Sequence, residues 1–211
     1  RRSAEKSAKG MIRIMSNAPE KQYIERKPKA RRMLNFTSSP ACEEILRVIP
    51  TRSISALSCW AIRYSKDQCL GIFDAHTTSS DGGLRRALDE SINICLGCAE
   101  ATASPRTAIR RGAVGPALKT VSRLACAETD PTAQAAARAI SVACASVRTP
   151  SSVFGFLFYL AAAKAYDAAG IGEPVGFYDD FTAKVMAEAL GSLTSETEPD
   201  PVNPCRIFLK L

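Results

Sequence analysis

Residues 124–150 read LACAETDPTAQAAARAISVACASVRTP, and this stretch decides the fold class. Asp130-Pro131 is a typical helix start, because aspartate caps free amides and proline suits the first helical position. No glycine or proline follows until Pro150, and β-branched residues are sparse, so the stretch predicts a helix over residues 130–148. Alanine covers several faces of that helix, which lets neighbouring backbones approach closely. We therefore expect this helix to lie between other helices.

Similar signals divide the rest of the chain into further helices. Ser39-Pro40 and Ser104-Pro105 predict two more helix starts, and Gly170 is expected to end the most aromatic helix. Strand-like alternation never persists. The sequence thus predicts an all-α, compact bundle of about six to seven helices. A further helix is expected from Thr51, as its cap, to about Ala75, closed by His76 and followed by a polar loop over 76–83. The next helix carries the row Leu84, Leu88, Ile92 and Leu96, and the last is expected over 174–190 with Gly191 just beyond its end.

Charge and proline content predict three parts. Residues 1–50 hold twelve Lys/Arg and five Asp/Glu, whereas residues 51–211 hold sixteen of each. We expect an extended basic arm over 1–38, an all-helical domain over 39–191 and an extended, proline-rich tail over 192–211. Such an arm suits an acidic protein surface, anionic lipid or RNA. The residues expected to contact partners are Arg26, Lys27, Lys29, Arg31, Arg32, Arg206 and Phe208.

The most apolar run argues against a membrane span. VFGFLFYLAAA at residues 153–163 is eleven residues long, whereas a transmembrane helix needs about 20 apolar residues. A run this short is typical of a buried core helix, so we expect no transmembrane segment.

Cys95 and Cys98 form the only cysteine pair with the CxxC spacing of redox or metal sites. A thioredoxin-like site needs a βαβ unit, and a zinc site needs two further ligands, whereas His76 is the only histidine. Cys95 and Cys98 are therefore the candidate metal ligands, but a buried, inert pair is favoured. The eight cysteines are expected to be free thiols of a reducing compartment. No cofactor is expected.

His76 is the one residue through which a histidine-dependent mechanism would have to run. It follows Asp74 at the end of a predicted helix, where a histidine also stabilises the helix dipole. We favour this structural role and expect no catalytic residue, so the chain is predicted not to be an enzyme. A CxxC- or histidine-dependent enzyme remains an alternative.

Three segments together resemble the helical domain of bacterial putative immunity proteins of the fifth type. They are YSKDQCLGIFDAHTTSSDGGLRRALDESINICLG at 64–97, AIRRGAVGPALKTVSRLACAETDPTAQAAARAISVACASV at 108–147 and FGFLFYLAAAKAYDAAG at 154–170. The resemblance covers about residues 56–170 and implies a compact helical bundle that binds a partner protein, in bacteria a toxin, without catalysis. The chain departs from that family in its basic arm, its many cysteines and its near lack of histidine.

These observations predict a non-catalytic accessory subunit of a large protein assembly, which binds its neighbours through the arm, the tail and the helical surface. A basic, acid-poor beginning with arginine as first residue fits a processed mitochondrial protein. We therefore expect a mitochondrial location, with a respiratory-chain or ATP-synthase complex as the assembly; a cytoplasmic location is the alternative. Two other functions remain open: a stand-alone immunity-type protein that neutralises a toxin, and a protein of the mitochondrial ribosome.

Overall fold

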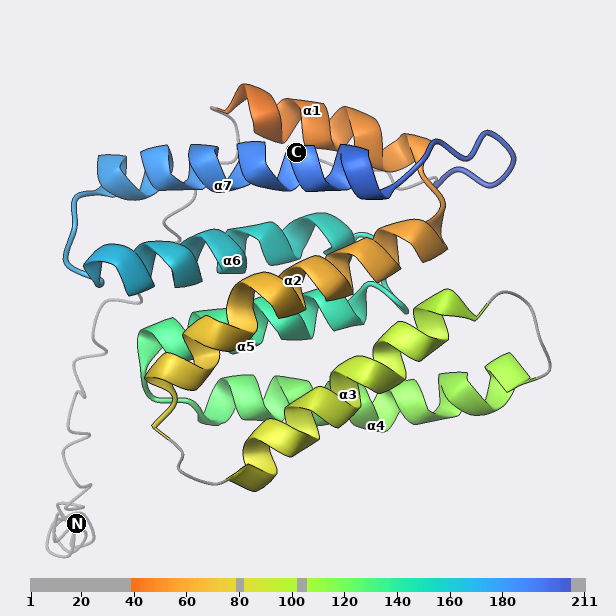
Figure 1. Ribbon diagram of the computed structural model, residues 1–211, viewed down its shortest axis with the longest axis horizontal. Coiled ribbons are helices and arrows are strands. Elements are labelled where there is room, and N and C mark those ends of the chain that lie inside the picture. The colour runs from red at the N-terminus through yellow and green to blue at the C-terminus, as the bar shows by residue number, and fades with distance from the viewer. Residues whose placement is uncertain (1–38, 79–81, 102–105, 206–211) are drawn as a thin grey trace, which may run out of the picture. The chain divides into compact units, whose positions relative to one another are not determined.

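Seven α-helices build the described part of this protein, as the predicted all-α class requires (Figure 1). The structure is a computed structural model that describes residues 39–78, 82–101 and 106–205, with only the backbone of 106–111. The expected arm over 1–38 lies outside the described residues. The helices are α1 (Pro40–Val48), α2 (Ile54–His76), α3 (Gly82–Glu100), α4 (Arg106–Ala127), α5 (Pro131–Ala145), α6 (Ser152–Ala169) and α7 (Val175–Glu196), with a 3-10 turn η1 (Ile49–Thr51) after α1.

Helix α5 occupies the centre of the bundle, as its alanines predict. It packs against α2, α3, α4 and α6, and Figure 1 shows it behind α2 with α6 and α4 on either side. Its fully buried residues are mostly alanines, namely Ala133, Ala136, Ala137, Ala139 and Ala143, together with Ile140 and Cys144. Small side chains on several faces let several helices come close to one axis, so α5 organises the packing of its neighbours.

Larger side chains of α2 and α6 fill the space beside α5. The Trp60 and Phe156 rings meet edge to face at 5.5 Å, and Tyr64 stacks on Trp60 at 5.7 Å. The Nε1 of Trp60 donates a hydrogen bond of 2.9 Å to Ser192 on α7, so this cluster also reaches the next helix. Most of the apolar run over 153–163 is buried in α6, as expected for a core helix. A search of the described helices finds none long and apolar enough to cross a membrane.

The segment after α7 folds back onto the junction between η1 and α2. The amide of Asp200 donates to the carbonyl of Thr51 at 2.9 Å, and the amide of Cys205 donates to the carbonyl of Arg52 at 2.6 Å. Arg52 and Pro199 form an isolated antiparallel bridge. Cys205 is fully buried, so the tail packs against the bundle at this residue; residues 206–211 lie outside the described residues.

Several predicted helix ends are confirmed. Asp130 accepts hydrogen bonds from the amides of Thr132 and Ala133, at 2.8 and 2.9 Å, as an N-cap should. Gly170 ends α6 with a φ of +75°, a conformation that favours glycine. Helix α2 ends at His76, as predicted. Ser39 is the N-cap of α1, although its side chain makes no capping bond.

Two predicted caps are wrong. Ser53, not Thr51, caps α2 by accepting from the amide of Ala56; the Thr51 hydroxyl instead donates to the carbonyl of Val48 and closes η1. Helix α7 does not end before Gly191 but continues to Glu196. The buried side chain of Leu193 extends the apolar stripe beyond the glycine, and this burial outweighs the low helix propensity of one glycine.

The two glycines should respond oppositely to alanine substitution. Gly191 lies inside α7, and a Cβ there would meet no atom within 4 Å, so Gly191→Ala should raise the free energy of unfolding by about 0.5–1 kcal/mol. Gly170→Ala should lower it by about 1–2 kcal/mol because of the positive φ. Urea denaturation followed by circular dichroism measures both. Destabilisation by Gly191→Ala would mean that α7 ends before this residue.

Enlarging one central alanine should test the close packing of α5. Ala136 is fully buried, so Ala136→Leu should lower the free energy of unfolding by about 1–3 kcal/mol through overpacking. Ala187 on α7 is exposed, and Ala187→Leu is the matched control, expected to change stability by less than about 0.5 kcal/mol. Equal effects of the two substitutions in urea denaturation would contradict the central position of α5.

Candidate functional site

The CxxC pair lies on α3, inside the bundle. Cys95 is fully buried and Cys98 is 8% exposed. The thiol of Cys95 interacts with that of Cys144 on α5, and this hydrogen bond lowers the pKa of Cys95 and raises that of Cys144. Among the described residues, no group of three or more His, Cys, Asp or Glu side chains could hold a metal ion. The thiol of Cys95 is thus hydrogen-bonded to a third cysteine, Cys144, which is not part of the CxxC motif.

His76 is paired with a residue that its sequence neighbourhood does not suggest. Its Nε2 lies 2.8 Å from Oδ1 of Asp167, which is near the end of α6. Both side chains are partly exposed, at 33% and 45%. No hydroxyl or thiol of a described residue is bonded to the other ring nitrogen, as the nucleophile of a Ser/His/Asp arrangement would be. The pair therefore ties the end of α2 to the end of α6.

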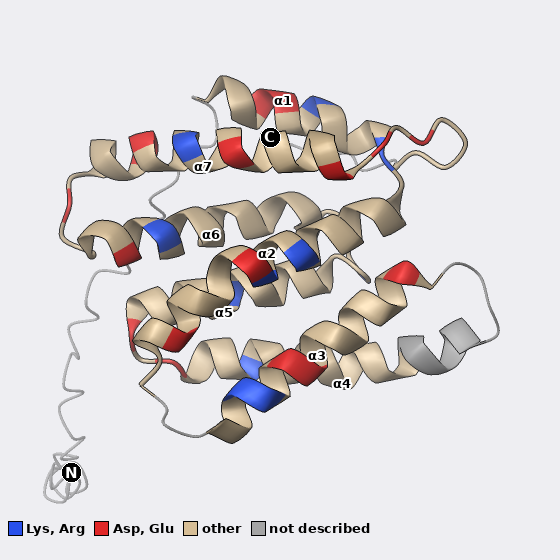
Figure 2. Cartoon of the chain, in the orientation of Figure 1, with Lys and Arg blue, Asp and Glu red and all other residues tan. Residues whose placement is uncertain are grey.

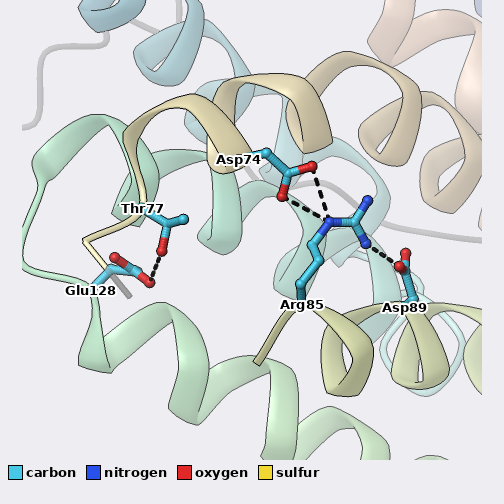
Figure 3. Close-up of polar contacts among 5 residues, drawn as sticks. All are labelled: Asp74, Thr77, Arg85, Asp89 and Glu128. Carbon is cyan, nitrogen blue, oxygen red and sulfur yellow. Dashed lines mark hydrogen bonds and ion pairs between the residues drawn. The ribbon is translucent and has the colours of Figure 1, made fainter. Parts of the chain in front are cut away.

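Glu128, between α4 and α5, is one of two charged residues that are buried within the described ranges. It is 5% exposed, and its Oε1 accepts a hydrogen bond of 2.8 Å from the Thr77 hydroxyl (Figure 3). Its backbone carbonyl accepts from Nε2 of Gln134 at 3.0 Å. The second carboxylate oxygen, Oε2, has no hydrogen-bond partner among the described residues. One residue further along each segment, the hydroxyls of Thr78 and Thr129 lie 3.4 Å apart.

Arg85 links α2 to α3 through its guanidinium group. Its Nε lies 2.8 and 3.1 Å from the two carboxylate oxygens of Asp74 on α2. Its Nη1 donates to Asp89, one turn further along α3. Figure 3 shows the guanidinium group between the two carboxylates. Asp74 is therefore bound to Arg85, so the structure does not bring it together with His76.

These contacts make the C-terminal end of α2 a joint between helices. We use the name α2 joint for His76, Thr77, Thr78, Arg85, Asp74, Asp89, Glu128, Thr129 and Asp167. Its interactions cross from α2 or the two residues after it to three other segments: to α3 at Arg85, to the α4–α5 connection at Glu128 and Thr129, and to α6 at Asp167. Each of these polar groups bonds to a side chain of the chain itself, an arrangement that holds helix ends in place.

Sequence reasoning anticipated this region only in part. It singled out His76 and Asp74 but missed Asp167 and Glu128, because their partners are 91 and 51 residues away along the chain. The only available signal was the ETDP sequence at 128–131, which was interpreted as a cap alone. The expected partner-binding residues of the arm and tail, Arg26, Lys27, Lys29, Arg31, Arg32, Arg206 and Phe208, lie outside the described residues.

Comparisons with protein-family models, with curated proteins and with solved structures find no match to this chain. The resemblance to an immunity-type helical domain therefore stays a prediction. The segments that suggested it have structural roles here. Arg85 and Asp89, from LRRALDE, belong to the ion pairs that link α3 to α2. From ETDP, Glu128 accepts a buried hydrogen bond and Asp130 caps α5.

The two adjacent arginines of α3 allow a matched test of the α2 joint. Arg85→Gln should lower the free energy of unfolding by about 0.5–1 kcal/mol, because it removes a partly exposed bridge from α3 to α2. Arg86 is exposed and has no ion pair among the described residues, so Arg86→Gln should change stability by only a few tenths of a kcal/mol. Thermal and urea denaturation at low salt measure both. An effect that is equal for the two variants would show that the bridge adds no stability.

Proposed function

We propose that this chain is a non-catalytic accessory subunit of a larger protein assembly. In this role the helical bundle is a rigid module, and its charged segments bind neighbouring proteins. The proposal is supported by what the polar groups of the α2 joint do: they bond to one another across helix ends. It is also supported by the distribution of charge along the chain, which is the observation that carries it.

Charge is segregated between the arm and the bundle. Residues 1–38 hold eleven Lys/Arg and three Asp/Glu. Residues 39–211 hold the remaining 17 Lys/Arg and 18 Asp/Glu, so they are close to neutral. Within the bundle, acidic residues concentrate towards the C-terminal end: residues 171–205 contain seven Asp/Glu and one Lys. In Figure 2 the acidic residues of this region are the red parts of the ribbon along α7 and in the segments before and after it. A strongly basic segment that precedes a near-neutral one in the sequence favours binding to an acidic surface.

We propose a mitochondrial assembly, of the respiratory chain or ATP synthase, as the setting. Support comes from the basic, acid-poor composition of the arm and from cysteines that serve as buried packing residues, such as Cys69 and Cys144. Burial raises the pKa of the Cys69 thiol to about 12, which keeps it protonated and unreactive. An RNA-binding role is less favoured, because the excess of positive charge is confined to the arm.

Neutralising the arm should release the chain from its assembly. A tagged full-length chain, expressed in the cells it comes from, should elute from gel filtration of a gentle extract far above its own 22.6 kDa. Changing Arg26, Lys27, Lys29, Arg31 and Arg32 to Gln should shift most of it to the monomer position. Raising the salt concentration should have the same effect on the unchanged chain, because exposed charges are screened. Mass spectrometry of the co-eluting chains identifies the partners.

A matched variant controls for loss of charge in general. It carries Gln at five exposed basic residues of the bundle that have no ion pair among the described residues, namely Arg86, Lys119, Arg123, Arg148 and Lys184. This variant should remain in the assembly. Elution of the unchanged chain as a monomer would refute the proposal, and a single small toxin as the co-eluting partner would replace it with the immunity-type function.

A further inference from the structure

Arg52 is a largely buried cation that has no counter-ion among the described residues. It lies between η1 and α2 and is 7% exposed. Its Nε is fully buried and has no hydrogen-bond partner in the part of the chain that the structure describes. None of the ion pairs or side-chain hydrogen bonds between described residues involves the guanidinium group. The other buried charge of the described ranges, Glu128, at least accepts a hydrogen bond from Thr77. The Nε of Arg52 is thus withdrawn from water without a hydrogen-bond acceptor among the described residues, which is unfavourable for part of a charged group and favours the binding of an anion to Arg52.

The backbone around Arg52 is held firmly. Its amide donates to the carbonyl of Ile49 at 3.2 Å, its carbonyl accepts from Cys205 at 2.6 Å, and it forms the bridge with Pro199. Both Ile49 and Cys205 are fully buried. An ion pair formed in such apolar surroundings is stronger than one in water, and the fixed backbone limits the freedom that the arginine would lose on binding.

Nearby carboxylates of the same chain do not fill this role. Glu198 and Asp200 flank Pro199, the residue opposite Arg52, yet neither forms an ion pair with it. In extended backbone successive side chains point to opposite sides, so the neighbours of a residue that faces Arg52 are directed away from it. Oδ1 of Asp200 is also occupied, because it accepts from the amides of Val202 and Asn203 at 3.1 and 2.8 Å.

We propose that the guanidinium group of Arg52 binds a carboxylate of a partner protein, either an Asp or Glu side chain or a C-terminus. Arginine pairs with a carboxylate through two parallel hydrogen bonds, and the positive end of the α2 dipole begins two residues later. Glu198 and Asp200 on the adjacent segment oppose a multiply charged anion such as phosphate more than a single carboxylate. The site thus selects an acidic protein residue over nucleic acid or anionic lipid. The identity of the occupant as a partner protein rests on the proposed function.

The site can be tested on the full chain without knowing the partner. The 1H–15N signal of Arg52 Nε, assigned by its loss in Arg52→Lys, is followed while sodium acetate replaces sodium chloride at constant ionic strength. Acetate should shift this signal in a saturable way, phosphate should do so at least tenfold more weakly, and chloride should leave it in place. No saturable shift, an equal response to chloride, or tighter binding of phosphate would each overturn the proposal.

Two further measurements separate the sources of the carboxylate. If a chain lacking residues 206–211 binds acetate while the full chain does not, the occupant is the chain's own C-terminus and the partner is refuted.

In the gel-filtration experiment, Arg52→Lys should reduce the fraction retained in the assembly at least tenfold, while the circular dichroism spectrum stays unchanged. Retention equal to that of the unchanged chain would refute the partner contact but not the assembly. Conversely, a monomeric unchanged chain would refute the assembly, while the acetate titration still reports on the Arg52 site.

Discussion

The bundle depends on how closely helices can approach α5. Side chains of one carbon, at Ala133, Ala136 and Ala139 among others, occupy faces that would otherwise keep the neighbouring helices apart. Alanine also has the highest helix propensity, so the residue that allows close packing also stabilises the helix itself. The bulk that α5 lacks is supplied by its neighbours, with Trp60 and Phe156 in contact beside it. A helix of small residues can only be central if large residues surround it, and α2 and α6 provide them.

The α2 joint is a consequence of that central packing. Because α2 and α6 both pack on α5, and α4 leads directly into it, the ends of these elements come together at the start of α5. Helix ends carry unsatisfied backbone groups, and polar side chains gather there to satisfy them. Asp130 caps α5, while Thr77 and His76 pair with Glu128 and Asp167. A cluster that contains a histidine, carboxylates and hydroxyls is thus explained by its part in joining helices.

The sequence was sufficient to predict the fold class, the central position of α5 and those helix ends that have a strong local signal. Asp130 and Gly170 act as expected because capping and a positive φ are properties of a few adjacent residues. The prediction failed where two local signals competed, as between Thr51 and Ser53, and where burial of Leu193 carried α7 past Gly191. The partners of the α2 joint could not be predicted, since pairs such as His76 and Asp167 depend on how the helices pack.

The two buried charges show the difference between a polar group used for folding and one available for binding. Glu128 lies where helix ends meet and accepts hydrogen bonds at its side chain and its backbone, so the chain itself accounts for much of its cost of burial. Arg52 has firm backbone bonds, but its buried Nε has no acceptor within the described ranges. The buried Nε loses its contact with water without a compensating hydrogen bond from the described residues, so Arg52 stabilises the bundle less than a paired arginine would. The positive charge of Arg52 is therefore better explained by an anion outside the bundle than by the stability of the bundle.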